Sequence, residues 1–508
     1  MLMMMLSVLF SMVSTAMMAY LAMNTQLGPW VAPVFVVVCM VFVIPLVKGG
    51  WFYEHAVIAI ASGSVGGMIG ICLGLSFPSF YFLHKELFDS WLQDPIKFSG
   101  IIFCFVVIAA LYALFLGYFL RHYFLHRPRA KFPMSQLVYD VIFVDVAKKS
   151  HRLMMSGLGV ATLWNSIMML SRSAWVLYAP QLHMFPLLMS VGFVAGMTIT
   201  FPVFIGLIIR EFGFKLVRVH TGSTLLTNSF LMTFCFGMLL MVVLRMIIVS
   251  WKNRKSQEVQ QRTEYWHKKF KDSAVFKWYV LIIGLIVAWL HFFGASVITC
   301  VYALIAIAWL SKYMVQIIAE VGIIEVDSYA WLVILPLVYI IAPPSMVVVS
   351  IAVFATLCLG LVVDFMFSYK LADLANVSYH KVVRYQMMAS VCAAISAGLF
   401  FWWYCQFLTY ESFALVAPKA HELDHVIKFG QYDHTVLMAG VLCAGLVLLL
   451  TSELLIVIGA VLMDPFMSLV LVIAGICAHF VKEREKLYPL WFGIYAGHML
   501  WLIVQAIL

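Results

Sequence analysis

The feature that most constrains this chain is a series of long apolar runs that do not alternate with polar positions. The hydrocarbon core of a membrane is about 30 Å thick and is crossed by a helix of about 20 residues. Only helices and closed barrels satisfy all backbone N–H and C=O groups in lipid, and barrel strands alternate apolar and polar residues. The sequence therefore predicts an all-α polytopic integral membrane protein.

The composition agrees with this prediction. Hydrophobic residues make up 64% of the chain and charged residues 11%, whereas soluble domains average about 45–50% and 25%. The ten cysteines lie inside apolar runs and predict neither disulfides nor a metal cluster. The net charge of +9 comes from basic stretches that flank apolar runs, as in cytoplasmic loops. We expect no nucleic-acid partner and no cofactor.

Fifteen runs are long enough to be membrane spans. They lie near residues 2–22, 28–47, 54–83, 98–120, 154–173, 182–209, 222–250, 275–295, 297–317, 327–343, 345–366, 383–407, 434–462, 464–481 and 488–508. A sixteenth segment, 135–147, is short and carries Asp140 and Asp145, so hydropathy alone indicates an amphipathic or re-entrant segment. The first run has no basic region before it and no cleavage site, and we expect a span rather than a signal peptide.

Basic loops set the predicted topology. Residues 121–131 and 251–277 are rich in Lys and Arg, so both loops should be cytoplasmic. An even number of crossings must separate them, which requires segment 135–147 as a crossing. The prediction is about sixteen transmembrane helices in two parallel eight-helix halves, with broken or re-entrant segments and both termini cytoplasmic. The predicted units are a first half at 1–250, a basic linker at 251–274 and a second half at 275–508.

Ionisable residues inside apolar runs are the first candidates for function. Placing a charged side chain at membrane depth costs several kcal/mol, so such residues usually face a cavity or a partner. The substrate or proton-coupling candidates are Glu54, His55, Asp140, Lys312, Glu320, Asp364 and Lys370. The structural alternative for each is a satisfied interhelical pair or an end residue that reaches the interface.

A glycine-rich stretch follows Glu54 and His55. Its small residues include Gly63, Gly66, Gly67 and Gly70. Glycines four residues apart favour tight helix packing, and the alternative is a thin or broken helix that lines a solute path. Pro78 favours a break in this run, and Pro343-Pro344 splits a later run into a tight membrane hairpin.

One motif favours an enzyme. His421, Glu422 and His425 match the HExxH pattern of zinc metalloproteases. The motif lies in an acidic loop, has no clear third ligand and carries Asp424 inside it, so a solvated loop or a metal-attracting extracellular mouth are the alternatives. The chain has no P-loop, and an ATP-driven pump is therefore not expected.

Three segments are similar to a known family. They are residues 54–61 with the glycine stretch, Lys131 to Ser135 (KFPMS), and Asp364 to Lys370 (DFMFSYK), with 318–322 (IAEVG) as a further match. In these segments the chain resembles a short, divergent, bacterial-type member of the oligopeptide transporter superfamily, which includes the yellow-stripe-like metal-chelate transporters. Phe367 and Ser368 replace the family's Gln and second Asp, and the Asn-Pro-Gly-Pro-Phe element of the peptide clade is absent. The resemblance implies sixteen spans and proton-coupled uptake of a small peptide or, with slight preference, a metal chelate.

The expected function is therefore a proton-coupled secondary transporter for small peptides or siderophore-like metal chelates, and not an enzyme. Glu54 and Glu320 would load and release protons, and Asp364 with Lys370 would form a coupling or gating hairpin. The alternatives are a membrane-embedded zinc enzyme and an uncoupled channel or permease. Expected partners are a small-molecule substrate, protons and the lipid bilayer, in a bacterial inner membrane. The oligomeric state, a homo-oligomer included, is left open.

Overall fold

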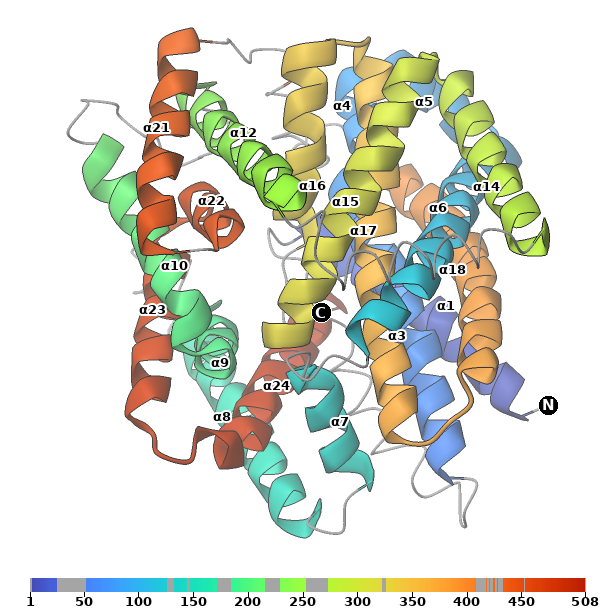
Figure 1. Ribbon diagram of the computed structural model, residues 1–508. Helices are drawn as coiled ribbons and strands as arrows, with labels where there is room; N and C mark the ends of the chain where they lie inside the picture. Colours follow the sequence, from blue (N-terminus) through green and yellow to red (C-terminus); the bar gives the residue numbers. More distant parts are fainter. Residues whose placement is uncertain are drawn as a thin grey trace.

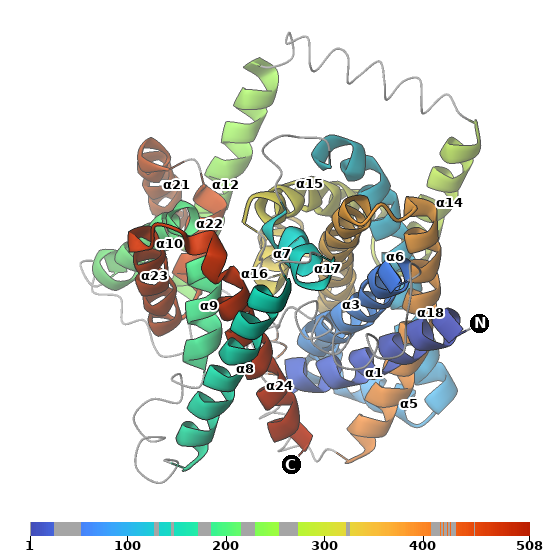
Figure 2. The ribbon, with the colours of Figure 1, turned by 90° about the horizontal axis from the view of Figure 1, so that it is seen from below.

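A computed structural model describes most of the chain, and every regular element in its described part is a helix (Figure 1). The described residues are 2–24, 52–125, 132–143, 147–170, 184–214, 229–252, 273–321, 326–407, 417, 420, 424, 427, 433–451 and 453–507. Within them the helices gather into two bundles, which lie side by side in both views (Figure 2).

The first bundle surrounds helix α17. Its long helices are α1 (Leu2–Asn24), α3 (Phe52–Ser76), α6 (Pro95–Phe124), α14 (Ser273–Phe292), α15 (Val297–Val321), α17 (Ser345–Leu374) and α18 (Tyr379–Phe407). The short helices α4 (Ser79–Leu83) and α5 (Lys85–Leu92) connect α3 to α6. Because α17 packs against α3, α6 and α15, helices from both ends of the sequence share one core.

The second bundle also combines early and late helices. Its members are α8 (Ala147–Leu170), α9 (Phe185–Ala195), α10 (Met197–Ile208), η3 (Ile209–Gly213), α12 (Ser229–Lys252), α21 (His434–Leu450), α22 (Leu454–Leu462), α23 (Pro465–Phe480), η7 (Arg484–Leu487) and α24 (Tyr488–Ile507). Helices α7 (Pro133–Phe143) and α16 (Val326–Pro336), which continues as η6 (Leu337–Ile341), contact both bundles, and α1 also contacts α24 directly. Residues 253–272 of the predicted linker lie outside the described part, and the division into two sequence halves stays a prediction.

Within the described part of the chain, five helices are long and apolar enough to cross a membrane, and all belong to the first bundle. They are Glu54–Leu83, Pro95–Phe124, Val297–Ala319, Ser345–Leu374 and Tyr379–Gln406. Each coincides with a predicted run, so the all-helical class is confirmed and these five runs are candidate membrane spans. Seven shorter apolar helices of 10–17 residues fall within other predicted runs.

The predicted breaks have clear backbone causes. Helix α3 ends at Ser76, two residues before Pro78, and α4 starts again at Ser79. After η6, Ala342 is left-handed with φ 45°, and α17 begins directly after the two prolines at 343 and 344. Segment 135–147 behaves differently from a full crossing, because α7 has 11 residues. Such a helix is about 16 Å long, roughly half the hydrocarbon thickness.

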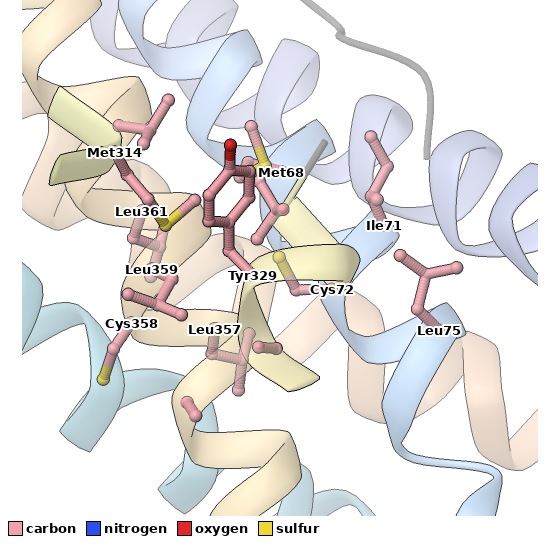
Figure 3. Packing of buried hydrophobic residues seen from close by; sticks show 14 of the residues in the cluster. Met68, Ile71, Cys72, Leu75, Met314, Tyr329, Leu357, Cys358, Leu359 and Leu361 are labelled. Carbon is pink, nitrogen blue, oxygen red and sulfur yellow. The ribbon is translucent and has the colours of Figure 1, made fainter. Parts of the chain in front are cut away.

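Helix α17 is buried on all sides from Val347 to Tyr369. A helix that is apolar around its whole circumference lies in a protein core or across a membrane, and α17 is covered by neighbouring helices along this stretch. Figure 3 shows this packing: Cys72 and Met68 of α3 lie beside the Leu357–Leu361 stretch of α17. The approach is close because residue 360 is glycine, where a Cβ would lie 2.6 Å from the Cys72 Sγ. The core of the first bundle is thus built on the α3–α17 contact.

Candidate functional site

A carboxylate is buried at this same contact. Asp364 of α17 has no exposed surface (0%), and among the described acidic residues it is the one with none. It lies ten residues from the C-terminal end of a 30-residue helix, about 15 Å along an axis of about 45 Å. This position puts the carboxylate well inside the span.

Asp364 has one polar partner. The Ser64 hydroxyl of α3 donates a hydrogen bond to its Oδ1. The second oxygen, Oδ2, has no hydrogen-bond partner in the described part of the chain. A buried carboxylate is expensive to keep charged without a cation or further donors, and binding of a proton removes that cost. The arrangement therefore suits a group that binds and releases a proton.

Polar side chains continue from Asp364 toward the end of α17. Ser368, one turn along the helix, is fully buried and its hydroxyl has no hydrogen-bond partner among the described residues. The Tyr369 ring meets the Tyr379 ring edge-on at 4.8 Å between centroids. Arg121 of α6 lies over the Tyr379 ring at 3.6 Å. Side chains with polar groups thus lie along α17 between Asp364 and the contact with the start of α18.

The predicted Asp364–Lys370 hairpin has a different form. Both residues lie inside α17, and the turn begins at Ala375. Lys370 forms an ion pair with Asp373 at 3.1 Å. Because Asp364 is deep in the helix and Lys370 is near its end, the two residues have separate environments.

Glu54 lies at the start of α3, with His55 beside it. Its carboxylate forms an ion pair with Lys381 of α18, with Nζ–O distances of 2.9 and 3.1 Å. The two side chains are 34% and 53% exposed. Glu54 thus joins the ends of two helices near solvent.

The Glu54→Gln variant is expected to lower the free energy of unfolding by no more than about 1 kcal/mol, because exposed ion pairs contribute about 0.2–1 kcal/mol. Denaturant unfolding of purified protein measures this change. Lys381→Gln should give a matching loss, and the double variant should lose little more than either single one. A loss of several kcal/mol in the free energy of unfolding would contradict the description of Glu54 and Lys381 as a partly exposed ion pair.

The glycine stretch packs α3 against α1. A Cβ on Gly66 would lie 2.3 Å from the Ser11 backbone oxygen, and one on Gly70 would lie 2.3 Å from that of Thr15. The Thr15 hydroxyl also donates to the Gly66 carbonyl at 3.0 Å. For Gly66 and Gly70 the structure therefore shows tight packing. Gly63 and Gly67 are buried in the same helix.

The remaining predicted residues are less well placed. Lys312 of α15 is half-buried, with its Nζ 5.7 Å from the Tyr313 ring centroid. Asp140 belongs to α7 and Glu320 to the last turn of α15, but their side chains fall outside the described part. His421, Glu422 and His425 also lie outside it. Among the residues that are described, no group of three or more His, Cys, Asp or Glu is arranged to hold a metal ion.

Two residues of interest were missed from the sequence. Ser64 lies within the glycine stretch, where the sequence pattern predicts only another small residue for helix packing. Arg210 follows directly after an apolar run, where a basic residue reads as a flanking charge. Its burial, with 3% of its surface exposed, is visible only in the folded chain.

These observations define the class as an all-helical membrane protein with a carboxylate buried in its central helix. No protein-family model matches the chain, and no curated protein matches it.

Proposed function

We propose that this protein is a proton-coupled secondary transporter of small peptides or metal chelates. The observation that carries the proposal is Asp364, buried in a membrane-spanning helix with one oxygen hydrogen-bonded to Ser64 and the other open. Ionisable groups in such positions are typical of ion and proton pathways. The resemblance to the oligopeptide transporter superfamily supports the substrate class, with metal chelates preferred.

The proposal assigns proton loading to Asp364. Glu54 is partly exposed and paired with Lys381, so its charge is already balanced. Glu320, also expected to carry protons, keeps that role as a prediction. The finer topology is part of the proposal as well: sixteen segments in two eight-helix halves, with both termini in the cytoplasm of a bacterium and the chain in its inner membrane.

Uptake into proteoliposomes tests the function. Purified protein is reconstituted, and uptake of labelled tripeptides and of iron or zinc chelates is measured with and without an inward proton gradient. The expected result is uptake of one class that the gradient drives and a protonophore abolishes, with protein-free liposomes as the control. Uptake that the protonophore does not change would instead indicate an uncoupled channel or permease.

A further inference from the structure

The second bundle contains a buried arginine that is not part of the proposed proton site. Arg210 belongs to the π-helical turn η3 and is only 3% exposed. Its Nε and Nη1 groups have no hydrogen-bond partner within the described structure. Unsatisfied buried donors of a charged group are costly, and a protein that keeps them has a reason outside its own packing.

Carboxylates lie near Arg210 without satisfying it. Asp464 and Glu211 are close enough to interact with its charge. Asp464, however, caps helix α23 and accepts a hydrogen bond from the Phe466 backbone N–H at 2.9 Å. Two carboxylates thus lie near the guanidinium, and its Nε and Nη1 groups stay without a hydrogen-bond partner in the described structure.

Two π-helical turns pack against the same turn of helix α12. At the end of η3, the Phe214 ring packs against Phe234 of α12 at 5.1 Å. Tyr339 of the other π-helical turn, η6, stacks on Phe236 of α12 at 5.5 Å. Cys235, which lies between Phe234 and Phe236 in α12, is near both Arg210 and Tyr339. π-helical turns are rare and occur frequently at functional sites, and here both converge on one turn of α12.

This place also lies where the two bundles meet. Helix α16 contacts α17 and α3 in the first bundle and α12 and α22 in the second (Figure 1). Its continuation η6 reaches α12 through the Tyr339–Phe236 ring contact. Pockets for small molecules commonly form at interfaces between such units. Arg210 therefore lies on the side of α12 that faces this junction through Cys235, the residue near both Arg210 and Tyr339.

We propose that Arg210 binds an oxyanion group, carboxylate or phosphate in type, of a small solute. The inference rests on the proposed function, for which it names the substrate as an acid: a peptide with a free C-terminal carboxylate or a carboxylate-bearing chelate. Guanidinium groups suit such ligands because their planar donors match an oxyanion.

Calorimetric titration of the purified full chain in non-ionic detergent tests the site. The probes are trialanine against its C-terminal amide, and citrate against its trimethyl ester. We expect one of the two acids to bind at least about tenfold more tightly than its neutral partner, as a charge-assisted hydrogen bond requires. Acid and neutral forms that bind alike would overturn the proposal.

Arg210→Met separates binding from packing. If Arg210 only held Asp464 in place, this variant would unfold more easily. If Arg210 binds a ligand, the Arg210→Met variant keeps the wild-type melting temperature or exceeds it, because the unpaired buried charge is gone. The variant also loses the tenfold preference for the acid. Arg384→Gln, at an exposed position of α18, is the matched control and should bind as the wild type does.

A second arm separates a solute from a lipid headgroup. Micelles are supplemented with phosphatidylglycerol, and melting temperatures of wild type and Arg210→Met are compared. Stabilisation of the wild type alone by this lipid, without any binding of the acids, would assign the oxyanion to a lipid and overturn the solute proposal. If the protein binds the acids through Arg210 but shows no gradient-driven uptake, the proposed binding site is supported and the proposed transport function is rejected.

Discussion

Asp364→Asn is expected to abolish gradient-driven uptake. Asparagine has nearly the same shape as aspartate and can still accept the hydrogen bond from Ser64, but it cannot bind and release a proton. Exchange of labelled for unlabelled solute across the membrane needs no net proton movement, so exchange should persist in the variant. Proteoliposome assays of driven uptake and of exchange, run on the same preparation, measure both rates.

Two controls accompany this variant. Asp373→Asn removes an exposed carboxylate of the same helix and should leave driven uptake unchanged. The melting temperature of Asp364→Asn should equal or exceed that of the wild type, because a buried group that is costly to charge has been made neutral. Driven uptake at the wild-type rate in Asp364→Asn would remove this residue from the coupling mechanism.

The second large effect is expected at the α1–α3 contact. Gly66→Ala places a Cβ 2.3 Å from the Ser11 backbone oxygen, and the helix backbone cannot yield as a flexible side chain would. Overpacking of this kind costs about 1–3 kcal/mol or more. We expect a lower melting temperature and less monodisperse protein after detergent extraction, as measured by thermal unfolding and size-exclusion chromatography.

Gly100→Ala is the matched control. Gly100 lies in α6, and a Cβ there has no neighbour within 4 Å. Helix propensity alone then favours alanine by up to about 1 kcal/mol. The two substitutions should therefore change stability in opposite directions, and a stabilising Gly66→Ala would show that α1 does not pack on α3 as described.

Hydrophobicity and proline positions made much of the first bundle predictable. Apolar runs such as 345–366 are long enough to identify a span without tertiary information. Pro78 and the prolines at 343 and 344 act through the local backbone, so their breaks were visible too. Segment 135–147 was assigned as a crossing only because an even number of crossings was needed between two basic loops, although the sequence already showed it to be short; helix α7 there has 11 residues.

The candidate site was only partly predictable. Glu54 and Asp364 look alike in sequence, since each lies near an end of an apolar run. What separates them is contact over long distances along the chain: Glu54 meets Lys381, 327 residues away, and Asp364 meets Ser64, 300 residues away. No local pattern encodes such pairs. The burial of Arg210 depends in the same way on α12 and α23, which follow it.

The packing of α17 inside α3 and α6 has a consequence for biosynthesis. Helix α6 ends at Phe124 and α17 begins at Ser345, so about 220 residues are made between them. At about 5–20 residues per second, α3 and α6 wait roughly 10–45 s in the bilayer before their central partner is synthesised. During that interval Ser64 lacks Asp364, and the surfaces of α3 and α6 that α17 covers lack this partner. The nascent chain therefore has a long window in which a membrane chaperone or a quality-control protease can act on it.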